Sequence, residues 1–289
     1  MATTGEWIAG ARPRTLPAAA APVFVGSGAA AQIDAFALLP ALLALGLALA
    51  LQIGVNYAND YSDGVRGTDL DRVGPLRLTA SGIAQPKDVK RAAVGSFAIG
   101  AVLGLIAIII TGHWWLLIVG ALSILAGWYY TGGKKPYGYL GLGEVGVFIF
   151  FGLVATLGTT YLQASKITMP AILGAVAIGL IACAILMANN IRDIPTDIVA
   201  GKRTLAVRMG DFRARQAYLA MIWIPIGLGV ACAFWTPWAL SVLFLLLPAV
   251  LLTLPIVAGA RGKLLVPVLA GTGMFELAFG VLLGLSLAL

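Results

Sequence analysis

Residues 47–63 read LALALQIGVNYANDYSD, an uncharged apolar segment that becomes polar without an intervening proline. If one helix continues through this stretch, its amides and carboxylates fall at positions i, i+3, i+4 and i+7, namely Asn56, Asn59, Asp60 and Asp63. Residues at these spacings lie on one face of an α-helix. The sequence therefore predicts an apolar helix whose end carries a polar stripe.

A second stripe follows the uncharged run 167–191. The residues at four-residue intervals are Asn189, Asp193 and Asp197, and Asn190 and Arg192 lie beside them. Pro195 predicts a kink, because proline removes a hydrogen bond from a helix. Solvated loops with incidental ion pairs are the alternative reading, but they give no reason for such spacing where an apolar helix ends.

The composition excludes a water-soluble enzyme. Of 289 residues, 60% are hydrophobic and 11% charged, against about 25% charged residues in soluble domains. The uncharged runs 92–133 and 216–260 are each about twice the length of one bilayer span. Both cysteines lie in apolar runs, which predicts neither a disulfide nor a thiolate metal site. We therefore expect an all-α integral membrane protein: a single domain over residues 1–289, a bundle of nine transmembrane helices, with two Asp-rich cytoplasmic loops after helices 2 and 6.

The basic residues predict the orientation of this bundle. When the 19 Lys and Arg are assigned to the connections between the nine predicted helices, all except Lys166 fall on one side. Basic connections stay in the cytoplasm, so the N-terminus and both Asp-rich loops are expected there and the C-terminus outside. The net charge of +7 is explained by this topology and by anionic ligands, and we expect no nucleic-acid partner.

The two stripes and the bases between them suit a metal and a phosphate. Mg²⁺ prefers oxygen ligands and is commonly held jointly by a few carboxylates and substrate phosphates. The predicted metal ligands are Asn59, Asp63, Asp69, Asn190, Asp193 and Asp197. Lys and Arg bind phosphate oxygens, and the predicted diphosphate-binding residues are Arg66, Arg72, Arg77, Lys134, Lys135, Arg192 and Lys202. Asp60 and Asp71 compete with Asp69 as ligands.

These residues resemble the UbiA-type intramembrane prenyltransferases, whose two aspartate-rich motifs follow the second and sixth of nine helices. Within that family, the motifs are most similar to the menaquinone-pathway branch. The similar segments occur in order along nearly the whole chain: Ala11–Pro17, Gly74–Leu78, Tyr130–Gly133, Pro136–Gly141, and Asn189–Asp193 running into Gly201–Leu205. One departure is that Asp69 stands six residues after Asp63, whereas the hydroxybenzoate branch has a spacing of four.

The resemblance implies a Mg²⁺-dependent enzyme of a bacterial cell membrane. It would transfer a polyprenyl chain from polyprenyl diphosphate to 1,4-dihydroxy-2-naphthoate, with loss of the carboxylate, to give demethylmenaquinone. It also implies that the catalytic residues are Asp63, Asp69, Asp193 and Asp197, and that the acceptor binds near Arg12, Tyr61, Tyr130, Tyr137 and Tyr139. Another aromatic acceptor, or a membrane transporter, is the alternative.

Three points stay open at this level. Aromatic faces can shield an allylic cation, and the candidates are Tyr57, Tyr61, Trp128, Tyr129, Tyr130 and Phe148. An Asp or a Tyr could accept the phenolic proton. Glu276 is a carboxylate within an apolar run, which suggests either a functional group or a hydrogen-bonded packing contact.

Overall fold

The computed structural model describes residues 2–67 and 76–289, and every regular element in these ranges is helical. The predicted Asp69, Asp71 and Arg72 lie outside the described residues. The α-helices are α1 (Thr4–Ala11), α2 (Leu16–Ala31), α3 (Leu38–Arg66), α4 (Pro86–Thr111), α5 (Leu116–Tyr129), α6 (Gly143–Val147), α7 (Ala155–Ala164), α8 (Met169–Val199), α9 (Leu205–Ala231), α10 (Leu246–Val257) and α11 (Val266–Ala288). A π-helical segment, η3 (Phe148–Val154), joins α6 to α7. The shorter η1 (Pro13–Thr15), η2 (Tyr137–Leu140), η4 (Cys232–Phe234), η5 (Pro237–Leu245) and η6 (Gly262–Leu265) complete the fold.

Within the described residues, seven helical segments are long and apolar enough to cross a membrane. Helices α2 and α5 contain 16 and 14 residues, fewer than the about 20 that a perpendicular span needs. The two double-length runs divide where expected, because α4 ends at Thr111 before Gly112 at φ 74°, and η5 begins at Pro237. Helix α1 was not predicted as a separate element, although Thr3 and Glu6 form a capping box at its start.

Both polar stripes lie on helices, as their spacing predicts, and the helices extend beyond them. Helix α3 continues through Asp63 to Arg66, and α8 continues through Pro195 to Val199. Because the backbone is helical, residues three or four positions apart in each stripe lie on the same face of the helix.

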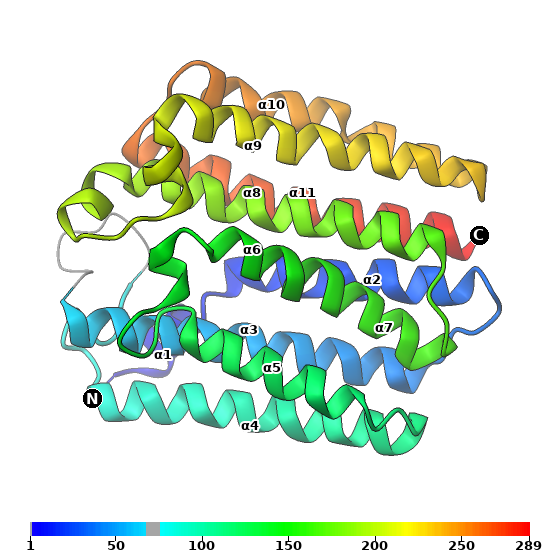
Figure 1. Cartoon of the computed structure of the whole chain (residues 1–289), viewed down its shortest axis with the longest axis horizontal. Helices are drawn as coiled ribbons and strands as arrows, with labels where there is room; N and C mark the ends of the chain where they lie inside the picture. Colours follow the sequence, from blue (N-terminus) through cyan, green and yellow to red (C-terminus); the bar gives the residue numbers. More distant parts are fainter. Residues whose placement is uncertain (1, 68–75) are drawn as a thin grey trace.

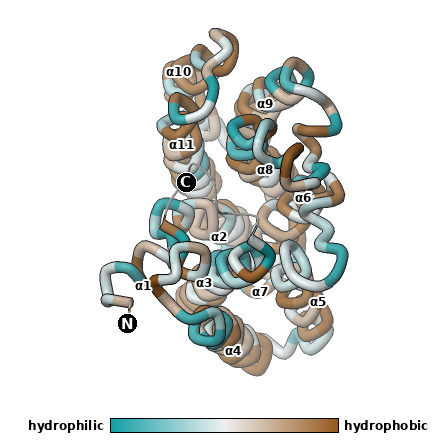
Figure 2. The backbone as a smooth tube through the Cα atoms, turned by 90° about the vertical axis from the view of Figure 1, so that its left-hand side faces the viewer, coloured by the Kyte–Doolittle hydropathy of each residue, from teal (hydrophilic) through white to brown (hydrophobic). Residues whose placement is uncertain are grey.

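The C-terminal ends of α3, α5, α8 and α10 lie at one end of the bundle, together with α1, whereas the C-terminus of the chain lies at the other (Figure 1). Seen along the helices from the end at which α1 lies, hydrophilic segments lie among the turns that face the viewer (Figure 2). The polar ends of α3 and α8 are therefore brought to the same end of the molecule.

The centre of the bundle is closely packed. Helices α2 and α11 approach so closely that a Cβ on Gly28 would lie 2.0 Å from the carbonyl oxygen of Gly284. The main core joins residues of α2, α8, α9, α10 and α11 and includes Cys232. Cys183 is also buried, and both cysteines are free thiols. Large apolar side chains such as Phe244 and Leu247, which are 80% and 67% exposed, cover the outside. Such a surface suits lipid and not water.

Candidate active site

A polar cavity of about 970 Å³ opens at the end of the bundle where the two stripes meet. Its wall combines the end of α3, the end of α8 and the connections that follow α1, α5, α8 and α10. The asparagine, aspartate and basic side chains that line it are Asn59, Asp63, Asn189, Asn190, Asp193, Asp197, Arg12, Arg14, Arg77, Arg192, Lys202 and Lys263. Residues of the two stripes, 126 residues or more apart in sequence, thus line one cavity.

On the α3 side, the ligand candidates are already oriented by hydrogen bonds. The hydroxyl of Thr131 donates to Asn59 Oδ1 at 2.8 Å. Tyr139 donates its phenolic O–H to Asp63 Oδ1, and Arg77 lies 3.8 Å from the other oxygen of Asp63. Asp63 is 3% exposed, so its negative charge is directed into the cavity and not into bulk water.

Asp60 does not belong to this set. Its two oxygens accept hydrogen bonds from the backbone N–H groups of Leu78 at 2.8 Å and Thr79 at 2.9 Å. The alternative in which Asp60 competes as a metal ligand is therefore not supported, because this carboxylate faces the backbone of residues 78–79. Its role is to attach that segment to α3.

On the α8 side, Arg192 Nε lies 2.6 Å from Asp193 Oδ1, and its Nη2 lies 2.8 Å from Oδ2. Since a carboxylate offers about four lone-pair sites, Asp193 can hold Arg192 and a cation together. Asn190 Nδ2 donates to Glu144 Oε1 at 2.9 Å, which leaves the Asn190 carbonyl oxygen as the group available to a ligand. Asp197 lies 3.5 Å from the hydroxyl of Thr204. Glu144 was not predicted to orient a ligand, and sequence spacing gave no signal for that role.

The described carboxylates fit metal ions that are shared with a substrate. Among residues 2–67 and 76–289, no three His, Cys, Asp or Glu side chains are close enough to hold one ion by themselves. Asp63 lies on one wall, whereas Asp193 and Asp197 lie on another. Mg²⁺ commonly keeps only one or two protein carboxylates and takes its other ligands from phosphate and water, so this donor set suits Mg²⁺ bound together with a phosphorylated ligand.

The predicted phosphate-binding cations divide into two groups. Arg77, Arg192 and Lys202 line the cavity. Arg66 instead donates to the carbonyl oxygens of Thr131 and Gly133 and fixes that connection. The structure does not bring Lys134 and Lys135 into the cavity either, since both are exposed and absent from its wall. Three cations that were not predicted to bind phosphate also line the wall: Arg12, Arg14 and Lys263.

The predicted acceptor residues divide in the same way. Arg12, Tyr130 and Tyr139 line the polar cavity. Tyr61 lines neither cavity described here and packs instead against Trp128, with ring centroids 6.2 Å apart, and beneath the ammonium of Lys90. The ring of Tyr139 lies 4.6 Å from Lys202 Nζ, so Tyr139 holds together Asp63 and a cavity cation.

Tyr137 lies in the connection between α5 and α6, with its ring 5.5 Å from that of Tyr130 in an edge-to-face contact. Burial disfavours the phenolate and raises the pKa of Tyr137 to about 12. The phenol is therefore protonated at physiological pH. In this form it can donate a hydrogen bond.

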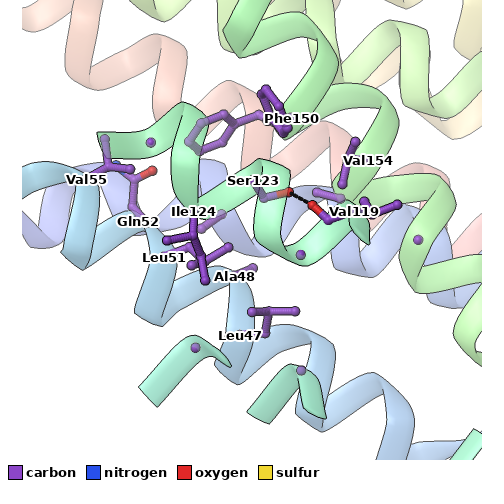
Figure 3. Close-up of a pocket in the computed structure, with 18 of the residues that line it drawn as sticks. Leu47, Ala48, Leu51, Gln52, Val55, Val119, Ser123, Ile124, Phe150 and Val154 are labelled. Atoms are coloured by element: carbon purple, nitrogen blue, oxygen red, sulfur yellow. Dashed lines mark hydrogen bonds between the residues drawn. The ribbon is translucent and has the colours of Figure 1, made fainter. Parts of the chain in front are cut away.

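A second cavity, of about 520 Å³, lies between helices α2, α3, α4, α5 and the α6–α7 segment. Figure 3 shows its wall, where Leu47, Leu51, Ile124 and Phe150 surround the space. The aromatic residues predicted to shield a cation are largely wrong: Tyr57, Tyr61, Trp128, Tyr129 and Phe148 line neither cavity. Phe150 and Phe151 do so instead. They lie on η3, and short π-helical segments recur at functional sites because they re-aim side chains.

The two cavities meet. Five residues line both of them: Gln52, Asn59, Tyr130, Val147 and Phe151. A charged chamber therefore lies beside an apolar one and shares part of its wall, here called the junction, which suits a ligand with an anionic head and a long hydrocarbon tail.

Comparison with known proteins agrees with this geometry. Residues 19–265 match the model of the UbiA prenyltransferase family. The chain is 49% identical over 288 residues to the 1,4-dihydroxy-2-naphthoate octaprenyltransferase of Mycobacterium tuberculosis, covering 100% of this chain and 98% of that protein. It is 42% identical to the protein of the same name from Escherichia coli, over 76% of this chain and 73% of that one.

Solved structures share the fold. A UbiA homolog from Archaeoglobus fulgidus bound to DMAPP and Mg²⁺ superposes with a TM-score of 0.71 at 13% identity, over 98% of this chain and 99% of that one. A UbiA homolog from Aeropyrum pernix gives a TM-score of 0.70 at 18% identity, over 93% and 96%. Since the family match extends over most of the sequence, this multi-span membrane protein belongs to the UbiA prenyltransferase family.

Proposed function

We propose that this protein transfers a polyprenyl chain from polyprenyl diphosphate to 1,4-dihydroxy-2-naphthoate, with loss of the acceptor's carboxylate, to give demethylmenaquinone. The observation that carries the proposal is the junction of the two cavities, where a basic, carboxylate-lined chamber shares its wall with an apolar one. The acceptor is taken from the names of the relatives, which match the chain over its full length.

The polar chamber is proposed to hold the diphosphate. Arg77, Arg192 and Lys202 are placed to donate to its oxygens and stabilise the negative charge that grows as the C–O bond breaks. Asn59, Asp63, Asn190, Asp193 and Asp197, together with Asp69 outside the described residues, are proposed to hold Mg²⁺. When bound, Mg²⁺ supplies further charge neutralisation for the leaving group.

The apolar chamber is proposed to hold the prenyl tail and to keep water away from the allylic cation. Phe151 and Tyr130 line the junction at which the reacting end of the chain must lie. The ring faces of both residues can stabilise the allylic cation through cation–π interactions. Phe151 also has no nucleophilic atom that could react with the cation. Arg12 and Arg14, on the polar side of the same junction, are proposed to pair with the acceptor's carboxylate.

We further propose nine membrane spans, with α2 and α5 as the two short ones, and a cytoplasmic location for the cavity mouth. The support is the charge asymmetry, since the basic connections lie at the mouth and Lys166 lies in the connection between α7 and α8. An enzyme is favoured over a transporter because the described carboxylates of the stripes lie at one end of the bundle and not at its midpoint.

The deciding experiment is a mass-spectrometric assay of the purified protein. The protein is mixed with 1,4-dihydroxy-2-naphthoate, a series of polyprenyl diphosphates and Mg²⁺, beside an EDTA control and beside an acceptor series that contains 4-hydroxybenzoate and homogentisate. We expect a prenylated, decarboxylated naphthoquinol only when metal is present. A product with another acceptor alone would overturn the acceptor assignment. No product and no released diphosphate from folded protein would overturn the enzyme itself.

A further inference from the structure

The side chain of Gln52 has a buried oxygen without a hydrogen-bond partner. Gln52 is 8% exposed, and its Oε1 is fully enclosed and makes no hydrogen bond. Leaving a buried acceptor unpaired is costly, so such an atom points to a ligand that donates to it. Gln52 lies on α3 one turn before Asn56, and no metal or phosphate role has been assigned to it.

The orientation of this amide is fixed by Thr15. The hydroxyl of Thr15 has one hydrogen, which it donates to the carbonyl oxygen of Arg12 at 2.9 Å. Its oxygen must therefore accept from the amide nitrogens of Gln52 at 3.0 Å and Asn56 at 2.9 Å. Asn56 Nδ2 also donates to the carbonyl oxygen of Ala11 at 2.9 Å. If the amide nitrogen and oxygen of Gln52 were exchanged, the amide oxygen would face the Thr15 hydroxyl, whose single hydrogen is already donated to Arg12. The assignment is therefore fixed, and Oε1 is the atom without a partner.

Gln52 is also one of the five residues at the junction of the two cavities. Figure 3 shows its side chain in the wall of the apolar cavity, next to Leu51 and Val55. The proposed donor substrate cannot satisfy Oε1, because a prenyl tail has no polar hydrogen and an ionised diphosphate only accepts. A hydroxyl on the aromatic acceptor can do so, and the acceptor ring must reach this junction to meet the reacting end of the tail.

We propose that Gln52 is a positioning residue for the acceptor, and this inference rests on the proposed function. Its Oε1 accepts a hydrogen bond from a ring hydroxyl of the dihydroxynaphthoate. The bond sets the ring's rotation, and hence which ring carbon faces the prenyl chain. Thr15 and Asn56 hold the amide, so that the acceptor oxygen is pre-oriented before the substrate arrives.

The test measures binding of two ligands, 1,4-dihydroxy-2-naphthoate and 2-naphthoate, which lacks both hydroxyls. The proteins are the wild type, Gln52→Met, Gln52→Glu and the control Gln163→Met, all full-length in detergent under anaerobic conditions. Gln163 is matched because it also hydrogen-bonds across helices, to Ser27 and Ala37, yet lines neither cavity. The KM for the polyprenyl diphosphate is measured in parallel.

The wild type is expected to prefer the dihydroxy ligand by about 10- to 100-fold. Gln52→Met should reduce that preference to within about 3-fold, with unchanged affinity for 2-naphthoate and unchanged donor KM. Gln52→Glu keeps acceptor oxygens and should keep the preference, as should Gln163→Met. A merely structural role would weaken both ligands equally in Gln52→Met.

Two results would overturn the inference while the proposed function stands: equal weakening of both ligands, or a preference that survives in folded Gln52→Met. The proposed acceptor, and this inference with it, falls if folded wild type binds neither naphthoate but still ionises the donor. If Gln52→Met does not fold, the two ligands are compared on the wild type and on Gln52→Glu. The inference is contradicted if neither of these proteins binds 1,4-dihydroxy-2-naphthoate more tightly than 2-naphthoate.

Discussion

The carboxylate of Asp60 on α3 accepts a hydrogen bond from the backbone N–H of Leu78 at 2.8 Å, although Asp60 is only three residues from Asp63 in the cavity wall. Two acidic residues within one helical turn therefore do different things. One attaches a connection to the helix, and the other faces the cavity, so their variants should separate stability from catalysis.

For Asp60→Asn we expect a loss of stability of about 2 kcal/mol, because hydrogen bonds to a charged group contribute roughly 1.5–3 kcal/mol. An asparagine can accept from Leu78 or Thr79 with its oxygen, but its NH₂ group then faces another donor. The Mg²⁺ concentration for half-maximal activity should be unchanged. Denaturant unfolding and a metal titration measure the two effects, and a shifted metal requirement at unchanged stability would contradict this division.

Asp63→Asn and Asp193→Asn should each lower kcat by at least about 100-fold, because each removes a charge from the group proposed to hold the metal. Both proteins should remain folded in detergent by size-exclusion chromatography. Asp211→Asn is the control, since Asp211 pairs with Arg215 at 2.9 Å away from the cavity. Near-wild-type turnover in both cavity variants would refute the metal assignment.

Lys202→Gln should raise the KM for polyprenyl diphosphate by about 10- to 100-fold, because a buried charge-assisted contact with phosphate is lost. Lys134→Gln should change it by less than about 2-fold, since Lys134 is exposed and not in the wall. Steady-state kinetics at saturating acceptor distinguishes them. The reverse order of effects would mean that the diphosphate binds outside the cavity described here.

Gly158→Phe should shorten the longest prenyl chain that the protein transfers. A Cβ built on Gly158 meets nothing within 4 Å, although this residue lines the apolar cavity, so a large side chain there takes up space for the tail. Gly227→Phe is the control, because Gly227 is exposed on α9 and its Cβ also meets nothing. The prenyl chain lengths of the products are measured by mass spectrometry after reaction with a mixture of donors. An identical distribution of chain lengths in both variants would contradict the proposal that this cavity holds the prenyl tail.

The raised pKa of Tyr137 predicts a loss of folding stability at alkaline pH. Its folded-state pKa is raised to about 12 by burial, above the ordinary value of about 10. Folding therefore favours the protonated phenol, and this stabilisation is complete below about pH 10 and is lost as the pH rises toward 12. Tyr137→Phe should lose less thermal stability than the wild type between pH 10 and 11.5. Tyr129→Phe, at an exposed position, should behave as the wild type does; equal slopes in all three would contradict the assignment.

Much of the site could be predicted because helical spacing is local. Asn59 and Asp63, and likewise Asn190, Asp193 and Asp197, keep their spacing on α3 and α8, and both stripes line one cavity. The division of the runs near Gly112 and Pro237 was also local, since a glycine at positive φ and a proline end helices by their own backbone geometry.

Contacts between distant segments could not be predicted in this way. Asp60 and Asp63 look equivalent in the sequence, but the backbone N–H groups of Leu78 and Thr79 donate only to Asp60. Arg66 and Tyr61 were predicted to bind substrates. Arg66 instead donates to the carbonyl oxygens of Thr131 and Gly133, and Tyr61 packs against the ring of Trp128.

By itself, then, the sequence determined an apolar helical bundle, two polar stripes and the class of chemistry, because hydropathy and helical period are properties of short segments. The tertiary structure decided which polar groups remain for a ligand. Buried donors and acceptors are nearly always hydrogen-bonded, and for Asp60 and Asn190 the partner comes from elsewhere in the chain, whereas Gln52 Oε1 has none there. The candidate site consists of the polar groups that the fold brings to one cavity wall, several of them already held by hydrogen bonds within the chain.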